Sequence, residues 1–133
     1  MHFRVMRIYG HSMMPTLRPG GLVLVQEREF ETRPPRRGEV VAATPAAFGG
    51  RPLVKRLAGL PHDRITVDGH TWDLQDDQYF LLGDQPERSA DSRIFGPVTG
   101  TELMGPVRLQ VWPWRLLRTR EQEVRDGQGL EVS

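Results

Sequence analysis

The sequence predicts a mainly β fold, in which antiparallel strands form a compact, barrel-like sheet. From residue 1 to 111 the chain alternates between short apolar runs and turns rich in Gly and Pro, and no helical periodicity lasts for three turns. One of these turns contains Asp68-Gly69, a pair that tolerates the positive φ angles of a tight β-hairpin. Strands joined by such turns run antiparallel.

Seven runs have the length and composition of β-strands: 2–9, 22–27, 39–43, 53–58, 64–67, 79–82 and 107–112. The segment 32–37 contains two Pro residues and lacks the backbone donors of a strand, so we expect a surface loop with solvated charges. After Arg115 the pattern favours a short helix, and the segment 126–133 has few groups to bury. We therefore expect one domain over 1–125 and a mobile tail over 126–133.

The composition excludes several functions. The 133 residues carry 18 basic and 17 acidic side chains, so no basic field favours a nucleic-acid partner. Cysteine is absent and the four His residues lack the spacing of a metal motif, so we expect no thiol nucleophile, metal or cofactor. The longest uncharged stretch, 40–50, has 11 residues, whereas crossing a bilayer takes ~20, and we expect no transmembrane segment or signal peptide.

Lysine occurs at one position. Of the 18 basic residues 17 are Arg, and the remaining one is Lys55. A strand with a two-residue period places Lys55 on the apolar face with Leu53 and Leu57. Burial disfavours the charged ammonium and lowers its pKa from ~10.4, whereas the guanidinium of Arg stays protonated. Lys55 is therefore a candidate general base that arginine cannot replace.

Ser12 is a candidate nucleophile. It follows a predicted strand and precedes Pro15, which holds the turn rigid and leaves the hydroxyl exposed. A serine hydroxyl needs a base beside it. The neighbouring His11 points to the opposite face of an extended chain, so Lys55 is the better candidate. The structural alternative is that Ser12 caps a turn and Lys55 extends from a sheet edge into water.

A third polar segment, 83–97, follows a predicted strand and combines turn-forming residues with Ser89, Asp91 and Arg93. Short hydroxyl side chains there can position a lysine, and an Asp–Arg pair can hold the loop together. With this segment, the functional interpretation of Ser12 and Lys55 is favoured over the structural one.

Together these segments resemble the conserved boxes of the type I signal peptidase family (S26), serine endopeptidases that use a Ser/Lys dyad on a mainly β fold. The matches follow the family's order over residues 10–98 and consist of Ser12, Met13, Pro15, Thr16, Leu17 and Gly20; Arg37-Gly38-Glu39; Lys55, Arg56, Gly59-Leu60-Pro61 and Asp63; and Gly83, Asp84, Ser89, Asp91, Ser92, Arg93 and Gly96. The chain resembles a compact member of this family without a transmembrane anchor.

The resemblance implies that Ser12 attacks the scissile carbonyl and that Lys55 takes its proton. Ser89 would orient the lysine, and Gly10 would lie beside the oxyanion. The resemblance gives structural roles to Met13, Pro15, Gly83, Asp84, Asp91, Ser92 and Arg93. It implies a hydrolase that cleaves leader or signal segments from precursor proteins after small residues, commonly Ala-x-Ala. Four positions depart from the family pattern: Gly10 replaces Ser, Gly21 replaces Asp, His62 replaces Gly and Gln85 replaces Asn.

Three other functions fit parts of the pattern. One is a dedicated precursor maturase, of the type that trims nickel superoxide dismutase. Another is a non-catalytic β module that binds peptides by strand addition. A self-cleaving repressor shares the dyad, but the eleven residues before Ser12 leave no space for its DNA-binding domain.

The location of the protein stays open between a peripheral membrane site and the cytoplasm. Trp112 and Trp114 lie beside Arg115 in a composition suited to a bilayer interface. Equally, these indoles can close the end of the β core.

Overall fold

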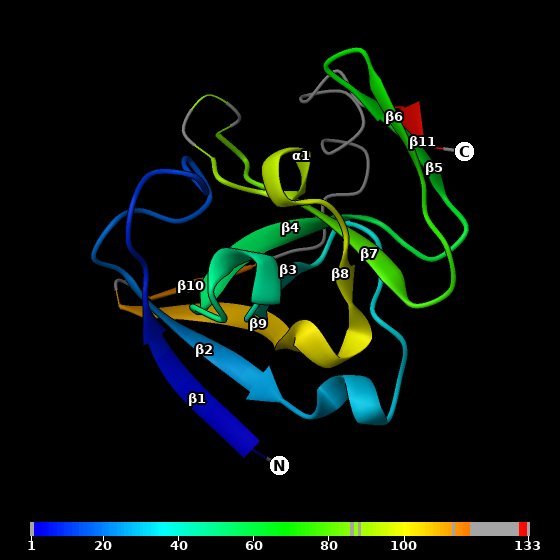
Figure 1. Cartoon of the computed structure of the whole chain (residues 1–133). Coiled ribbons are helices and arrows are strands. Elements are labelled where there is room, and N and C mark those ends of the chain that lie inside the picture. The colour runs from blue at the N-terminus through cyan, green and yellow to red at the C-terminus, as the bar shows by residue number, and fades with distance from the viewer. Residues whose placement is uncertain (1, 86, 88, 113, 118–130, 133) are drawn as a thin grey trace.

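The computed structural model describes residues 2–85, 87, 89–112, 114–117 and 131–132. Figure 1 shows a fold built mainly from strands. The strands are β1 (His2–Arg7), β2 (Leu22–Glu27), β3 (Val40–Ala43), β4 (Leu53–Gly59), β5 (Arg64–Val67), β6 (His70–Asp73), β7 (Gln78–Leu82), β8 (Val98–Thr99), β9 (Leu103–Trp112), β10 (Trp114–Leu116) and β11 (Glu131–Val132). The short helices are α1 (Ser92–Phe95) and the 3₁₀ turns η1 (Glu29–Glu31), η2 (Ala46–Phe48) and η4 (Gly100–Glu102).

Two antiparallel sheets form the molecule. The larger sheet has the order β1-β2-β9-β3-β4-β7-β8, with β10 paired to β9. The smaller sheet, β11-β5-β6, lies to one side of it (Figure 1). The predicted mainly β, antiparallel fold is confirmed. In the described part of the chain the larger sheet is open, with β1 and β8 at its two ends, rather than closed into a barrel.

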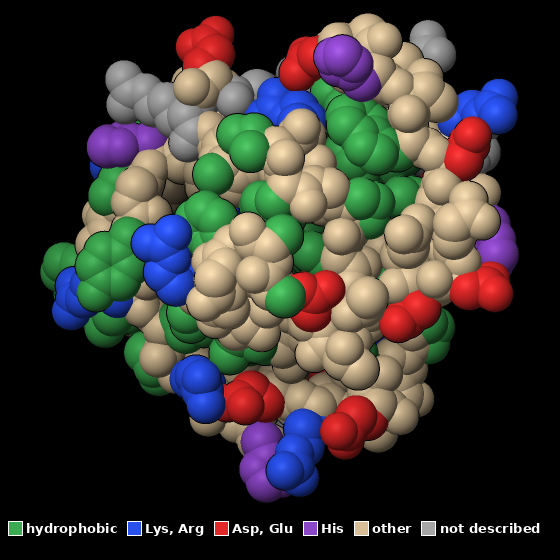
Figure 2. All heavy atoms as spheres, in the orientation of Figure 1, with side chains coloured by type: hydrophobic (Ala, Val, Ile, Leu, Met, Phe, Trp, Pro, Cys, Tyr) green, Lys and Arg blue, Asp and Glu red, His purple; other side chains and the backbone are tan. Residues whose placement is uncertain are grey.

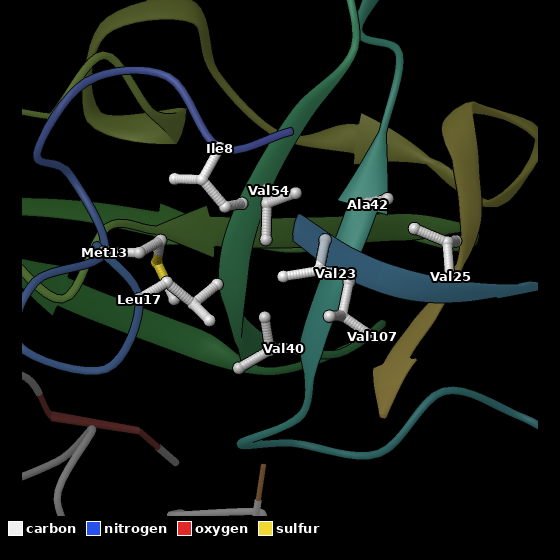
Figure 3. Close-up of a cluster of buried hydrophobic side chains, with 9 residues drawn as sticks. All are labelled: Ile8, Met13, Leu17, Val23, Val25, Val40, Ala42, Val54 and Val107. Carbon is white, nitrogen blue, oxygen red and sulfur yellow. The ribbon is translucent and has the colours of Figure 1, made fainter. Parts of the chain in front are cut away.

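Alternating side chains of β2 build the core beneath the first loop. Val23 and Val25 are fully buried, whereas their neighbours in β2 are half-buried, as expected for a strand with one face in the core. Met13 and Leu17, from the loop after β1, join the same apolar cluster (Figure 3). This packing anchors the loop that carries Ser12.

Two predicted strands have the observed bounds, and one begins four residues earlier. The ranges of β2 and β5 are as predicted, and Asp68 and Gly69 form the tight turn with φ angles of 53° and 77°. Strand β9 begins at Leu103 rather than at residue 107, although it contains Pro106. Register shifts in the pairing of β9 with β2 and β3 accommodate this irregular start.

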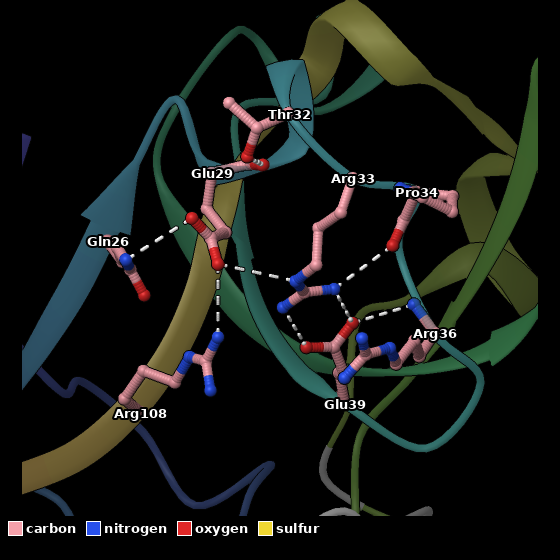
Figure 4. A network of polar contacts seen from close by, with 8 residues as sticks. All are labelled: Gln26, Glu29, Thr32, Arg33, Pro34, Arg36, Glu39 and Arg108. Carbon is pink, nitrogen blue, oxygen red and sulfur yellow. Dashed lines mark hydrogen bonds and ion pairs between the residues drawn. The ribbon is translucent and has the colours of Figure 1, made fainter. Parts of the chain in front are cut away.

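The segment 32–37 is a loop, as predicted. Its Arg36 is exposed, but the prediction of solvated charges is wrong for Arg33 and Arg37. Arg33 binds Glu39 through two hydrogen bonds of 3.0 and 2.7 Å and also contacts Glu29 at 3.4 Å (Figure 4). Arg37 pairs with Asp63 at 2.6 Å. Because Glu39 and Asp63 are largely shielded from water, the loop arginines compensate their charges and fix the path between β2 and β3.

The C-terminal predictions fall mostly outside the described residues. The helix expected after Arg115 does not begin there, because Leu116 belongs to β10 and Leu117 is not helical; its remaining residues, 118–125, lie outside the described part of the chain. In the expected tail, Glu131–Val132 pair with β5. Among the described residues, none of the helices has the length and hydropathy needed to cross a membrane.

Candidate active site

Ser12 and Lys55 line the same cavity. The loop after β1 and the first residues of β4 border this space of about 280 Å³, and Gly10 and Ala90 contribute to its wall. Ser12 is half-buried. The structure thus brings together the two residues that the sequence singled out as nucleophile and base.

Lys55 lies in β4, where it pairs with Val41 of β3, and β7 pairs with the other side of β4 from Arg56 onward. The residue is 5% exposed. Its Nζ atom donates a hydrogen bond to Ser89 Oγ over 3.2 Å. Burial lowers the pKa of the Lys55 amine from 10.5 to about 8; the nearby charge of Asp91 opposes this fall, and that of Arg93 adds to it.

Asp91 organises the loop that holds Ser89. This carboxylate is fully buried and accepts hydrogen bonds from Ser89 Oγ at 2.7 Å and from the Gly83 N–H at 2.9 Å. Arg93 donates to both carboxylate oxygens, with distances of 3.0 and 2.9 Å. Since the Ser89 hydroxyl donates its own proton to Asp91, its oxygen is oriented to accept from Lys55.

Gly83 allows three segments to meet. A Cβ atom built at this position would lie within 3.0 Å of the Ser89 side chain and of the Ser12 carbonyl oxygen. The same carbonyl accepts a hydrogen bond of 2.6 Å from the Gln85 N–H. Glycine at the end of β7 therefore lets the loop of Ser12 pack directly against the segment of Ser89.

Arg56 is a structural tie that the sequence analysis did not single out. It is 2% exposed, and it donates to both Asp84 oxygens at 3.1 and 2.7 Å, to Thr16 Oγ1 at 3.3 Å and to the Gly38 carbonyl at 3.0 Å. Thr16 also donates to Asp84 over 2.6 Å. One sequence signal for this role is that Arg56 directly follows Lys55 in a strand, so its side chain points to the opposite face of the sheet. A guanidinium buried on that face needs a carboxylate partner.

The other predicted site residues surround this arrangement. Gly10 adopts a φ of 74° at the cavity wall, in the region that favours glycine. Met13 packs into the core, and Pro15 lies exposed in the same loop. Ser92 is buried and accepts a hydrogen bond from the Leu81 N–H at 2.8 Å. His11 is exposed and also borders the cavity.

Comparison with known proteins identifies the family. The model of the family described as "Signal peptidase, peptidase S26" matches residues 1–73 and 68–112. The mitochondrial ATP-independent inner membrane protease subunit 1b of Arabidopsis thaliana is 33% identical, over 80% of this chain and 69% of that protein. Mitochondrial inner membrane protease subunit 1 of Schizosaccharomyces pombe is 34% identical, over 84% and 74%. The probable signal peptidase I-2 of Synechocystis is 29% identical, over 77% and 60%.

The fold and these matches define a serine endopeptidase of the signal peptidase type. The chain belongs to the signal peptidase family, peptidase S26. The resemblance found in the sequence boxes is thereby confirmed. The chain spans 60% of the length of its Synechocystis relative and about 70% of the two mitochondrial proteins.

Proposed function

We propose that this chain cleaves precursor proteins with Ser12 as the nucleophile and Lys55 as the general base. The observation that carries the proposal is the environment of Lys55: a buried amine, on the cavity that Ser12 also lines, with its pKa lowered to about 8. With this pKa, roughly one tenth of the amine is neutral at pH 7. An ordinary lysine has a far smaller neutral fraction and is a poor base at that pH.

In the proposed first step, Ser12 Oγ attacks the carbonyl carbon of the scissile bond while its proton moves to the neutral Nζ of Lys55. The ammonium so formed gives this proton to the nitrogen of the leaving peptide, and the C–N bond breaks. Lys55 then takes a proton from the water that attacks the ester, and it returns this proton to Ser12 Oγ as the ester C–O bond breaks. Ser89 accepts the hydrogen bond of Lys55 and acts as a positioning residue.

The oxyanion of the intermediate would be stabilised by backbone groups. We assign this role to the N–H of Ser12, with the backbone of Gly10 at the adjacent wall of the cavity. The sequence resemblance associates a serine hydroxyl with position 10, and Gly10 lacks it. The oxyanion would therefore receive hydrogen bonds from backbone N–H groups and none from a side chain at this position. Loss of one such donor costs ~10²-fold or more in rate, so we expect modest turnover.

The cavity suits an extended peptide with a small residue at the cleaved bond. Within the described pairing, β7 meets β4 from Arg56 onward, which leaves the edge of residues 53–55 open to a substrate strand. The apolar side chains of Ile8, Met13 and Val54 limit the space beside Ser12. These observations support cleavage after small residues, and the family supports precursor proteins as the substrates.

Cleavage of an Ala-x-Ala leader peptide by the purified chain tests this proposal. We expect Ser12→Ala and Lys55→Arg each to abolish cleavage while the thermal unfolding curve keeps its cooperativity. Thr101→Ala and Arg64→Lys, which change exposed residues outside the cavity, serve as matched controls and should cleave normally. Normal activity of Lys55→Arg would exclude a neutral-amine mechanism. Binding of the peptide without cleavage by the unmodified chain would favour the non-catalytic β module.

We also infer a peripheral membrane contact, carried by exposed apolar side chains of the edge strand β1 and of the end of β9. Phe3 and Val5 of β1 are 49% and 56% exposed, and Trp112 at the end of β9 is 63% exposed. Arg7, which is exposed, lies on the same face of β1 as Phe3 and Val5, where it can meet anionic headgroups. Co-sedimentation with anionic phospholipid vesicles should fall in a Phe3→Ser/Trp112→Ser variant. No sedimentation of the unmodified chain would refute this contact.

A further inference from the structure

The active-site cavity extends to an aromatic side chain that the proposed reaction does not use. Phe48, the last residue of η2, lines the cavity together with Pro52 and Leu53. It comes from the connection between β3 and β4. Figure 2 shows hydrophobic side chains reaching the surface around α1, the helix whose Phe95 contacts Phe48.

The ring of Phe48 is fixed by two neighbours. Its centroid lies 6.0 Å from that of Phe95, with the planes at 45° to each other. The guanidinium carbon of Arg51 lies 4.5 Å from the centroid of the Phe48 ring. Contacts of both kinds favour a defined ring position over free rotation. Phe48 therefore presents a fixed apolar wall to the cavity.

The backbone around Phe48 is also held in place. The Ala46 N–H donates to a Glu102 carboxylate oxygen at 2.6 Å, and the Gly50 N–H donates to the Pro45 carbonyl at 2.8 Å. Gly49 and Gly50 both have a φ of 70°, which returns the chain sharply toward β4. This tight turn explains why Phe48 and the first residues of β4 border one space.

The position of Phe48 relative to Ser12 and Lys55 determines which residue of a bound substrate it can contact. Leu53 lies two residues before Lys55 in β4, so the two are separated by roughly 6.6 Å at a strand rise of about 3.3 Å per residue. Phe48 comes from the turn that precedes Leu53 in the chain and borders the same cavity. An extended peptide whose cleaved bond lies at Ser12 would therefore bring a side chain to Phe48 roughly two to four residues from that bond.

The chemistry of this end of the cavity is apolar. Phe48, Pro52 and Leu53 offer no charged or hydrogen-bonding side chain, and none of the described residues that line the cavity is acidic. Burying a large apolar side chain against such a wall is favourable, whereas a neutral polar one loses part of its hydration there. We therefore expect this wall to favour substrate side chains with a large apolar surface.

We propose that Phe48 forms a second subsite of the cleft, which takes a large apolar side chain of the precursor roughly two to four residues from the scissile bond. This inference rests on the proposed peptidase function and adds a determinant of substrate choice to it. Phe48 acts on substrate binding and takes no part in proton transfer. The subsite would let the enzyme discriminate among precursors that all present small residues at the cleaved bond.

A positional peptide series tests the subsite. Each peptide keeps Ala-x-Ala at the cleaved bond and carries Phe, Leu, Ser or Asp at one of the flanking positions. We expect the unmodified chain to prefer Phe or Leu over Ser roughly tenfold or more in kcat/KM at one position, because a buried apolar side chain gives discrimination of that size. Phe48→Ala should reduce this preference to about threefold or less.

Phe30→Ala is the matched control. Phe30 is likewise a partly buried ring on a 3₁₀ turn, with an arginine over its face, but it lies outside this cavity. It should leave the preference unchanged. Phe48→Leu retains apolar bulk and should keep most of the preference, so a loss caused only by misfolding of Phe48→Ala is recognised. An unchanged preference in a folded Phe48→Ala variant would overturn the proposal.

Peptide binding separates this inference from the proposed function. Fluorescence anisotropy with the Ser12→Ala variant measures affinity where no cleavage occurs. If the Phe peptide binds better than the Ser peptide and Phe48→Ala removes the difference, the subsite is supported even if the unmodified chain cleaves nothing. If the chain cleaves the peptides with no apolar preference at any position, the subsite is refuted and the peptidase function stands.

Discussion

The Nζ atom of Lys55 and the Oγ atom of Ser89 lie 3.2 Å apart, and the same Oγ donates to Asp91 over 2.7 Å. One hydroxyl thus separates the amine from a fully buried carboxylate. The carboxylate stabilises the ammonium form, whereas burial destabilises it more strongly, and the pKa of Lys55 settles at about 8. The predictions below follow from this balance and from the ties that hold the site together.

Replacing Lys55 by Met should stabilise the fold at neutral pH. Because the folded pKa of about 8 lies below the ordinary 10.5, protonation of Lys55 opposes folding. This cost is absent above pH 10.5, grows as the pH falls toward 8, and is complete below it. Lys55→Met should therefore raise the free energy of unfolding at pH 7 by on the order of 2 to 3 kcal/mol. Urea unfolding at neutral and alkaline pH measures it; a gain equal at both pH values would contradict this account.

Asp91→Asn should move the pH dependence of cleavage toward acid. The charge of Asp91 raises the pKa of Lys55, and that of Arg93 lowers it, so loss of the carboxylate charge leaves only the lowering influence. The inflection in kcat/KM should shift to lower pH, with a smaller maximal rate because Ser89 loses its ionic partner. Asp73→Asn, which alters an exposed pair with Arg64, is the control. An inflection shifted toward alkaline pH would be the opposite of the expected result.

Arg56→Met should destabilise the fold strongly. It leaves the Asp84 carboxylate, which is 15% exposed, without its cation, and it removes the tie to Thr16 and to the Gly38 carbonyl. Breaking a buried pair of this kind costs about 3–5 kcal/mol. The control Arg64→Met breaks an exposed pair and should leave Tm nearly unchanged. Equal effects of the two variants on Tm would show that Arg56 is not the tie described.

His62→Gly should stabilise the protein. His62 has a φ of 72°, a conformation that costs a side chain bearing Cβ about 1 kcal/mol, and its 2.8 Å contact with Asp76 is exposed. Glycine, which the sequence resemblance associates with this position, removes that cost. His70→Gly, in strand β6, is the matched control and should lower Tm. A lower Tm for His62→Gly would mean that the Asp76 contact outweighs the backbone cost.

The sequence predicts those elements whose pattern lies within a few neighbouring residues, and it does not predict those that depend on contacts between distant segments. Strands with clear alternation, such as β2, were predicted with their observed bounds. The start of β9 was missed because Gly105 and Pro106 oppose a strand locally, whereas the close approach of Gly105 to the Gln26 carbonyl can be seen only in the folded sheet. In the same way, short-range patterns do not reveal that Arg33 compensates Glu39.

In the active site, too, local patterns were predictable and contacts between distant segments were not. Ser12 and Lys55 were singled out by residue type, turn chemistry and the resemblance of their segments to known boxes. The Arg56 tie and the Phe48 wall were not, because each depends on which segments meet in space. Phe48 lies in a Pro- and Gly-bounded stretch that the sequence marks as a connection and nothing more.

The pH profile of kcat/KM for an Ala-x-Ala peptide tests the central claim most directly. Measured on the unmodified chain from about pH 6 to 10, it reports the pKa of the essential base in the free enzyme. If neutral Lys55 activates Ser12, kcat/KM should rise about tenfold per pH unit at the acid end and level off above an inflection near pH 8. A profile that is flat across this range, or that falls through pH 8, would contradict a general base at Lys55.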